Sequence, residues 1–357
     1  MFNKFKNKTI IVTGHTGFKG SWLTLWLKLL GAKVVGISID LPSKPSHYKE
    51  LNFSKKIINI KQDIRNLKKL EKIFQKYQPD FIFHLAAQAL VQRSYKDPVT
   101  TFNTNTIGTM NVLESLKKIK KKFAAVIITS DKSYKNMEIE RGYHENDLLG
   151  GKDPYSASKG AAEIIIQSFI NSYFINKKQN VAIARAGNVI GGGDWSENRL
   201  IPDCVKSWSI NKKAKIRNPN STRPWQHVLE AVRGYLRLAE CLYSNRKLHG
   251  EPFNFGPKQS QNKNVITLVK LMKKFWSNVS WKKNKNYKEI YESKLLKLNS
   301  TKAKKKLKWT PIIDFEDTIK MTTVWYKNFY QKKNKIQKFS EKQIIDYMKK
   351  IDRKKYL

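Results

Sequence analysis

The feature that most constrains this chain is a glycine-rich stretch at residues 9–32. It reads TIIVTGHTGFKGSWLTLWLKLLGA, so an apolar β-branched run leads directly into Gly14, Gly17 and Gly20, and an apolar run of helical length follows. This order is typical of a strand, a tight turn and a helix, because each glycine leaves room where a Cβ would clash. The helix N-terminus then offers free N–H groups to phosphate. The stretch predicts a dinucleotide-binding turn whose other binding residues are His15, Thr16, Phe18 and Lys19.

His15 places a bulky side chain inside this tight glycine turn. Two interpretations stay open from the sequence. The imidazole either loosens cofactor binding or is an exposed side chain of the turn.

The remaining composition is that of a large globular protein. The chain has 357 residues, of which 40% are hydrophobic, and no apolar run approaches the 18 residues of a membrane span. The first residues, MFNKFKNK, lack a hydrophobic signal segment, which predicts a cytoplasmic protein without a membrane partner. Cys204 and Cys241 are too few and too isolated for a disulfide framework, and no metal site is predicted.

The formal net charge of +42 raises the question of nucleic-acid binding. Lys accounts for most of the basic residues and is spread over every predicted helix, and Asn and Ile are also abundant. A biased base composition of the gene would produce this pattern without a selected basic groove. No nucleic-acid-binding motif accompanies the charge, so we expect no specific nucleic-acid partner, only weak non-specific adhesion.

Strand and helix patterns alternate through the first half of the chain. Strands are predicted at 9–13, 33–38, 57–61, 81–88 and 124–131, with helices at 66–77 and 98–118 and from 154 onwards. This alternation predicts an α/β fold, a Rossmann-type doubly wound parallel sheet. The predicted domains are an NAD-binding domain at 1–187, a smaller substrate lobe at 188–335 with some segments returning to the first domain, and a tail at 336–357 that packs back.

The ends of the predicted strands suggest where a dinucleotide would lie. The second strand ends at Ser38, and Asp40 is the nearest acid for the adenosine ribose, with no Arg cluster for a 2′-phosphate. NAD is therefore favoured over NADP. His84, inside the apolar fourth strand, is interpreted as a core histidine. Further cofactor contacts are expected at Asp63 and Ile64 after the third strand and at Leu85, Ala86 and Ala87 after the fourth.

Two later segments carry candidate catalytic groups. Ser130 and Asp131 follow the fifth strand, at the sheet edge where open α/β sheets bind ligands. Tyr155 and Lys159 are four residues apart and share a helix face. Free tyrosine has a pKa near 10, and a neighbouring ammonium lowers it, so Tyr155 becomes a usable base. Ser130, Tyr155 and Lys159 together suit the oxidation of an alcohol.

Longer motifs make the resemblance to a known family specific. They are VTGHTGFKGSWL at 12–23, TSDKSY at 129–134, GGKDPYSASKGAAE at 150–163, ARAGNVIGGGDW at 184–195 and RPWQHV at 223–228. With these motifs the chain resembles the nucleotide-sugar dehydratases of the extended short-chain dehydrogenase/reductase family, and most closely the CDP-glucose 4,6-dehydratases. The resemblance covers nearly the whole chain.

The resemblance implies a reaction and a role for each catalytic residue. NAD oxidises C4 of CDP-glucose, water leaves across C5 and C6, and the hydride returns to C6. Tyr155 is then the C4 base, Lys159 its partner and a ribose contact, Ser130 the group that orients the hydroxyl, and Asp131 the acid for the C6 hydroxyl. Lys132 stands where the dTDP-glucose enzymes have Glu, so the C5 base is Lys132, water or another residue.

The resemblance also implies the remaining contacts. Asn105 joins the cofactor residues, and the substrate residues are Gln88, Arg93, Ser94, Asn188, Arg199, Arg217, Arg223 and His227. Arginine suits a bidentate diphosphate contact, and Arg223 is the residue expected to make it. For Arg199 and Arg217 a structural ion pair is the alternative. Trp225 and His227 line the nucleotide pocket or simply pack the lobe.

Three broader expectations follow from the same resemblance. The helices at 98–118 and 155–174 would pair between subunits in a homodimer or homotetramer. The product would supply a deoxysugar for O-antigen-type polysaccharide. The alternatives are a dehydratase for another nucleotide, a 4-epimerase, which has no use for Asp131 as an acid, and a catalytically silent NAD-sensing or nucleic-acid-binding protein.

Overall fold

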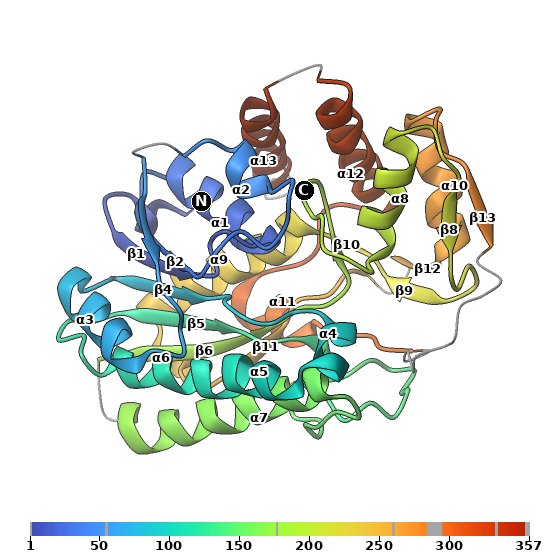
Figure 1. Cartoon of the computed structure of the whole chain (residues 1–357). Coiled ribbons are helices and arrows are strands. Elements are labelled where there is room, and N and C mark those ends of the chain that lie inside the picture. The colour runs from blue at the N-terminus through green and yellow to red at the C-terminus, as the bar shows by residue number, and fades with distance from the viewer. Residues whose placement is uncertain are drawn as a thin grey trace.

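The computed structural model describes residues 2–53, 56–175, 178–258, 261–283, 295–332 and 335–353. Its centre is a seven-stranded sheet of order β11-β6-β5-β4-β1-β2-β3, and every neighbouring pair is parallel (Figure 1). The strands are β1 Thr9–Thr13, β2 Lys33–Ser38, β3 Ile58–Lys61, β4 Phe81–His84, β5 Ala124–Ile128, β6 Asn180–Arg185 and β11 Pro252–Asn254. The order reverses between β1 and β4, so the predicted doubly wound sheet is confirmed.

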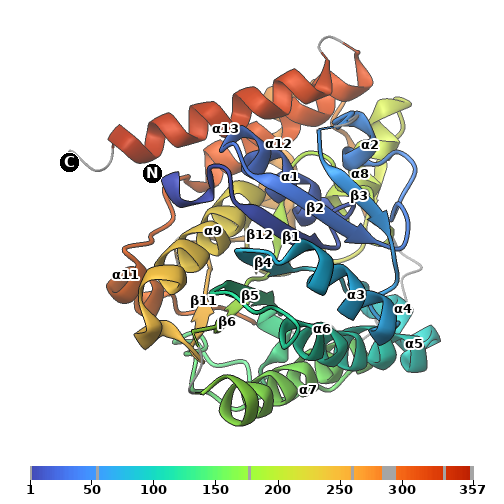
Figure 2. The same ribbon diagram turned by 90° about the vertical axis from the view of Figure 1, so that its left-hand side faces the viewer.

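Helices cover both faces of this sheet. Successive β1 side chains alternate between two buried cores: Ile10 and Val12 lie in one, and Ile11 lies in the other. Figure 2 shows α1 and α9 on one side and α3, α6 and α7 on the other. These helices are α1 Phe18–Leu29, α9 Val228–Ser244, α3 Leu67–Tyr77, α6 Gly108–Leu116 and α7 Pro154–Phe169.

The long helix predicted at 98–118 begins where expected. The Asp97 side chain accepts the Thr100 N–H at 3.0 Å and Pro98 occupies the first turn, so this end is capped. The helix runs as α5 Pro98–Phe102, a π-helical turn η2 Asn103–Ile107 and then α6. A second π-helical turn, η4 Ile170–Phe174, extends α7.

The second half of the chain forms a lobe of short sheets beside the carboxyl ends of the main strands (Figure 1). β7 Val189–Ile190 pairs with β10 Gln226–His227, β9 Thr222–Pro224 with β12 Asn262–Asn264, and β8 Ala214–Ile216 with β13 Trp281–Lys283. The helices α8 Leu200–Ser209 and α10 Val265–Phe275 belong to this region. β11 and α9 return to the main sheet, and the domain boundary at residue 187 stays a prediction.

The C-terminal tail packs back onto the body, as predicted for its described part. Helix α13 Ile336–Arg353 lies against α1 and against α12 Phe315–Tyr330. The Tyr347 ring meets Trp26 edge-on at 5.6 Å, and its hydroxyl donates to Glu230 at 2.8 Å. Residues 354–357 of the predicted tail lie outside the described residues.

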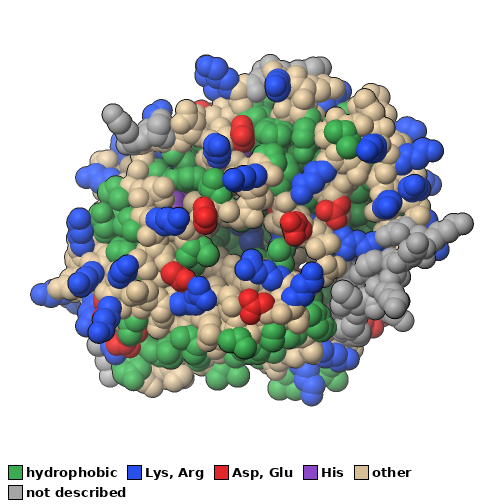
Figure 3. Space-filling model, viewed as in Figure 1, with side chains coloured by type: hydrophobic (Ala, Val, Ile, Leu, Met, Phe, Trp, Pro, Cys, Tyr) green, Lys and Arg blue, Asp and Glu red, His purple; other side chains and the backbone are tan. Residues whose placement is uncertain are grey.

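Short elements complete the chain: η1 Asn3–Phe5, α2 His47–Glu50, α4 Val91–Lys96, η3 Asp131–Ser133, η5 Arg246–Leu248 and α11 Thr301–Leu307. No helix in the described part of the chain is both long and apolar enough to cross a bilayer. Among the same residues, His, Cys, Asp and Glu side chains nowhere gather in a group that could hold a metal ion. Figure 3 shows Lys and Arg side chains over the whole of one face, with acidic side chains among them near a central hollow.

Candidate active site

The glycine turn brings three backbone segments into contact. Gly14 has φ +73°, and a Cβ there would lie 2.6 Å from the backbone nitrogen of Ala86. A Cβ on Gly20 would lie 2.1 Å from the Gly14 carbonyl oxygen, so neither position accepts another residue without a backbone shift. Gly17 is the N-cap of α1 and has no side chain that could accept a hydrogen bond from the N–H groups of this helix end. The turn therefore fits the phosphates of a dinucleotide.

His15 is buried beneath this turn, so the interpretation as an exposed side chain is wrong. Its Nδ1 lies 2.9 Å from the Ser38 hydroxyl, and its Nε2 lies 2.9 Å from the Asn59 side-chain oxygen. Gly36 gives the ring its space, because a Cβ there would lie 2.3 Å from the imidazole. Burial lowers the pKa of His15, so the neutral ring links β1, β2 and β3. The effect of His15 on cofactor affinity stays a prediction.

The predicted adenosine residues lie along the ends of β2 and β3. The Thr16 amide donates to the Ser38 hydroxyl at 3.3 Å, and the Thr16 hydroxyl donates to the Asp40 carbonyl oxygen at 2.7 Å. A cavity of about 950 Å³ opens here, lined by Ile39, Lys61, Gln62, Asp63, Arg65, Asn66, Leu67, Lys68 and Lys69. Although partial burial acts to raise the pKa of Asp63, its hydrogen bonds with Arg65 hold that pKa below the usual value. Ile64 is buried beside this cavity.

The segment after β4 is fixed by side chains from two helices. The Gln88 amide donates to the Asn105 side-chain oxygen at 2.8 Å, and Asn105 donates in turn to the Ser158 hydroxyl at 2.9 Å. The predicted contacts Leu85, Ala86 and Ala87 are half-buried at this edge. His84 is held between the hydroxyls of Thr13 at 2.7 Å and Thr109 at 3.0 Å, and burial lowers its pKa to about 3, so the core interpretation is confirmed.

The end of β5 brings the Asp131 carboxylate together with the Ser130 hydroxyl and the Lys132 ammonium. The Ser130 hydroxyl donates to the Asp131 carboxylate at 3.0 Å and also hydrogen-bonds Tyr155. The Lys132 ammonium lies 3.3 Å from Asp131, whose side chain is only 2% exposed. A Cβ on Gly187 would lie 1.8 Å from the Asp131 carboxylate. Residue 187, after β6, must therefore be glycine to leave room for this acid.

Tyr155 stands at the start of α7, where two side chains fix it. Asp153 caps the helix by accepting the Ser156 amide at 3.0 Å, and the Ser94 hydroxyl accepts the Tyr155 amide at 3.1 Å. Burial raises the pKa of Tyr155, and the Ser130 hydrogen bond and the Lys132 charge act against that rise. The sequence predicts a lowered pKa for Tyr155. In the protein alone this prediction is wrong, because burial outweighs the effect of the neighbouring cations.

Two lysines next to these groups have weakened basicity. Burial and the positive charge of Lys19 lower the pKa of Lys159 to about 8, while Glu163 acts to raise it. Burial and the charge of Arg199 lower the pKa of Lys19 to about 8 as well. The Lys19 amine lies 3.4 Å from the hydroxyl of the buried Tyr235 on α9.

Comparison with known proteins agrees with this geometry. A sequence profile described as GDP-mannose 4,6 dehydratase matches residues 11–322. The chain belongs to this family. It is 42% identical to the CDP-glucose 4,6-dehydratase of Salmonella typhimurium over 97% of this chain and 98% of the relative. It is 28% identical to the dTDP-glucose 4,6-dehydratase of Haemophilus influenzae over 89% and 97%.

Solved structures have the same fold as this dehydratase-family chain. The UDP-glucuronic acid 4-epimerase of Bacillus cereus, in complex with UDP-glucuronic acid and NAD, matches with a TM-score of 0.77 and 24% identity over 90% of this chain and all of the other. The dTDP-glucose 4,6-dehydratase of Bacillus anthracis in complex with NAD matches with a TM-score of 0.75 and 21% identity over 91% and 98%.

Of the predicted substrate residues of this family member, some lie at the catalytic cluster and the others are placed elsewhere in the fold. Asn188 and Arg199 join the catalytic cluster: the Asn188 amide lies 3.5 Å from Asp131, and the Arg199 charge acts on the pKa of both Tyr155 and Lys19. Arg199 also pairs with Asp194 at 2.9 Å. Arg217 pairs with Asp203 at 2.8 Å, so a structural ion pair exists for both arginines.

Other predicted substrate residues are engaged in the fold. Gln88 donates to Leu90 and Thr101, and Ser94 is used at the start of α7. His227 ends β10 and is the N-cap of α9; it is fully buried, and burial lowers its pKa to about 3. Trp225 donates to the Lys263 carbonyl oxygen at 2.8 Å, and Arg223 donates to the Thr222 carbonyl oxygen at 2.7 Å. Arg93, the last of the predicted substrate residues, is exposed on α4.

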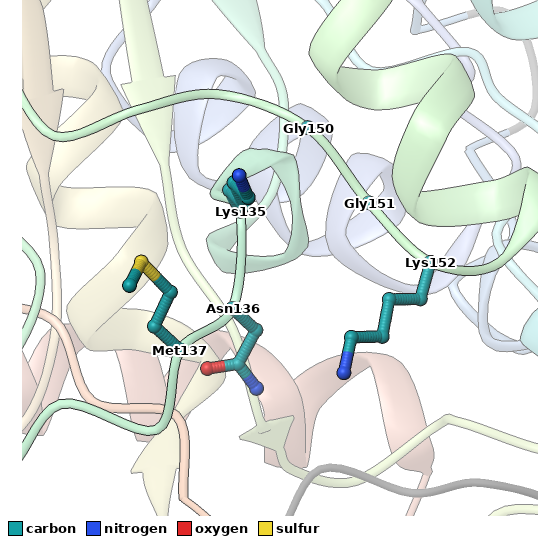
Figure 4. A pocket seen from close by; sticks show the side chains of 6 residues that line it. All are labelled: Lys135, Asn136, Met137, Gly150, Gly151 and Lys152. Carbon is teal, nitrogen blue, oxygen red and sulfur yellow. The ribbon is translucent and has the colours of Figure 1, made fainter.

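Some residues of the site were not identified from the sequence. Glu163 is four residues after Lys159, and this spacing could have identified it. Asp194 and Tyr235 reach the site from the second half of the chain. Asp194 lies inside the motif at 184–195, which could have identified it, whereas no local pattern marks Tyr235. Figure 4 shows a further cavity, of about 520 Å³, which none of the predicted site residues lines; its walls are Lys135, Asn136, Met137, Gly150, Gly151 and Lys152.

Proposed function

We propose that this protein is a CDP-glucose 4,6-dehydratase, a lyase that converts CDP-D-glucose to CDP-4-dehydro-6-deoxy-D-glucose and water. The observation that carries the proposal is the buried Asp131 carboxylate between Ser130 and Lys132, beside the phenol of Tyr155. Oxidation and reduction at C4 need no such acid, whereas elimination of a hydroxyl does. The Salmonella typhimurium relative, similar over nearly the full length of both chains, supports the choice of CDP-glucose.

NAD is the cofactor that the glycine turn fits. The N–H groups at the start of α1 would hold its phosphates, Ser38 and Asp40 would meet one ribose, and Lys159 would meet the other. When bound, NAD would supply the hydride acceptor for oxidation at C4 of the sugar and the hydride donor for reduction at C6. The family members solved with NAD support this assignment.

Tyr155 takes the proton of the C4 hydroxyl, and Ser130 orients that hydroxyl. Because burial raises the pKa of Tyr155, its phenolate needs the opposing effects of the Ser130 hydrogen bond and of the Lys132 and Arg199 charges. The closely spaced cations of this site thus serve the base as well as the anionic substrate.

Asp131 and Lys132 supply the proton transfers of the elimination. Their side chains form an ion pair at 3.3 Å. Once Tyr155 holds the C4 proton, its phenolate no longer needs the Lys132 charge, and one proton passed from Nζ to the carboxylate leaves a protonated acid and a neutral amine. Asp131 then protonates the departing C6 hydroxyl, and Lys132 takes the C5 proton. Lys132 as the C5 base stays a hypothesis, with water or another residue as the alternative.

The test is an incubation of the purified protein with CDP-glucose and NAD in deuterated water, followed by mass spectrometry. We expect loss of one water and incorporation of one deuterium at C5. The Tyr155→Phe variant should bind CDP-glucose but show no turnover. Dehydration of dTDP- or UDP-glucose instead would overturn the choice of nucleotide, and C4 inversion without water loss would identify a 4-epimerase.

The proposal includes a homo-oligomer and a cytoplasmic role in deoxysugar synthesis for O-antigen-type polysaccharide. α5 and η2 expose Val99, Phe102 and Ile107 at 69%, 37% and 40%, and α7 exposes Ile164 at 63%. α5 and α7 are in contact, so these side chains offer a surface on which a second copy could pack. The exposed apolar side chains support a dimer or tetramer.

A further inference from the structure

A buried carboxylate lies behind the catalytic residues. Glu163 is on α7, one turn after Lys159, and its side chain is 1% exposed. One of its oxygens accepts the Thr129 hydroxyl at 2.6 Å, and both accept from the Arg185 Nε at 2.8 and 3.0 Å. The carboxylate therefore joins α7 to the ends of β5 and β6.

Arg185 has several hydrogen-bond partners besides Glu163. Its guanidinium donates to the Tyr134 hydroxyl at 2.5 Å and to the Glu145 carbonyl oxygen at 2.9 Å, and it lies 4.6 Å from the centre of the Tyr134 ring. Tyr134 donates onward to Asn254 on β11 at 2.8 Å. A buried charge with this many partners is fixed in one position, so Glu163 meets a rigid partner.

The Glu163 contacts reach both halves of the catalytic set. Thr129 directly precedes Ser130, and Lys159 lies on the same α7 face as Glu163. The hydrogen bond between Thr129 and Glu163 thus connects the strand end that carries Ser130 to the helix that carries Tyr155. Glu163 also acts on Lys159 by charge, because it raises the pKa that burial and Lys19 lower.

We propose that Glu163 is a positioning residue that, through Thr129, fixes Ser130 against Tyr155 and keeps the Lys159 ammonium next to a negative charge. This inference rests on the proposed function. The carboxylate hydrogen-bonds Thr129 and Arg185, and neither of these is one of the proposed catalytic groups. Its effect is alignment, and a misplacement of about 1 Å can cost about 100-fold in rate.

The test separates alignment from stability with two substitutions at Thr129. Thr129→Val keeps the shape and leaves the Glu163–Arg185 pair intact, but it removes the hydroxyl, whereas Thr129→Ser retains it. We expect Thr129→Val to lower kcat about 10-fold or more with KM for CDP-glucose within about twofold. Thr129→Ser should stay near wild type. Equal kinetics in all three proteins, or an equal loss in both variants, would overturn the proposal.

A second readout needs no turnover. The hydrogen bond between Ser130 and Tyr155 acts to lower the pKa of Tyr155. If Thr129→Val displaces Ser130 and this hydrogen bond is lost, the pKa of Tyr155 should rise. Ultraviolet difference titration against Tyr155→Phe in each background measures this shift. If the wild type fails to dehydrate CDP-glucose, the proposed function fails, and an unshifted titration in Thr129→Val would overturn the positioning role separately.

Glu163→Gln tests the charge directly. Because Glu163 raises the pKa of Lys159, the alkaline loss of kcat should begin at lower pH in this variant. An alkaline limb at the wild-type position would contradict the charge effect. Glu163→Gln also leaves Arg185 without its carboxylate, so failure of this variant to fold returns the decision to the two Thr129 variants.

Discussion

At the scale of single residues, the same burial acts in opposite directions on Tyr155 and on Lys159. Removal from water raises the pKa of Tyr155 and lowers that of Lys159, because it disfavours the charged form of each. The Ser130 hydrogen bond and the Lys132 and Arg199 charges oppose the rise for Tyr155, although its pKa stays raised. In the proposed mechanism the activation of Tyr155 therefore depends on Ser130, Lys132 and Arg199 as well as on Lys159.

The pKa of about 8 for Lys159 predicts the alkaline limb of activity. Lys159 should lose its proton as the pH rises through 8, so kcat should fall there although the phenol is better ionised. Lys19→Met should move this limb to higher pH, because the Lys19 charge lowers the pKa of Lys159. The measurement is kcat against pH for both proteins.

Stability should not follow activity in this window. The folded-state pKa values of Lys19 and Lys159, about 8, lie below the ordinary lysine value of about 10.4. Between these values the unfolded chain binds more protons than the folded one, so these two groups make stability rise with pH. Thermal unfolding that tracks the loss of kcat above pH 8 would contradict the assignment of the limb to Lys159.

At the scale of elements, the sequence was enough to predict a strand, turn or helix wherever the pattern lies within a few neighbouring residues. The glycine turn, the strand that ends at Ser130 and the helix that carries Tyr155 each follow from residues close together in the chain. The surroundings of His15 do not, because Gly36, Ser38 and Asn59 come from two other strands. A pattern within one turn could not show that the imidazole would be buried.

The same limit explains the pKa of Tyr155 and the partners of the arginines. Burial of Tyr155 and the effect of Arg199 depend on the second half of the chain folding over the sheet edge. Arg185 and Glu163 are 22 residues apart, on a strand and a helix whose packing no local pattern specifies. Long-range contacts of this kind become visible only in the folded chain.

Helix α13 leads to a stability prediction at the same scale. The buried Tyr347 hydroxyl donates to Glu230 and accepts from the Arg233 Nε, both at 2.8 Å. Tyr347→Phe removes both hydrogen bonds between α13 and α9, which we expect to cost about 1–3 kcal/mol of unfolding free energy. Urea unfolding measures it. Tyr173→Phe, at a 44% exposed residue, is the matched control and should change little.

At the scale of the whole molecule, charge and apolar surface oppose each other. Two copies of a chain with net charge +42 repel, and salt reduces this repulsion because the screening length falls to about 8 Å at 0.15 M. The apolar side chains exposed on α5, η2 and α7 gain by association whatever the salt concentration. We therefore expect the proposed oligomer to strengthen as salt increases from low to about 0.15 M.

Two substitutions locate that association. Val99→Glu and Ile164→Glu place charges at residues 69% and 63% exposed on the contacting helices α5 and α7, which lie side by side in Figure 1. Each should reduce the mass measured by light scattering toward that of one chain, because a buried unpaired carboxylate is costly. Ile210→Glu, at a 61% exposed residue after α8, is the control and should leave the mass unchanged. An unchanged mass in all three variants would place the interface elsewhere, and a loss in Ile210→Glu alone would move it to the other lobe.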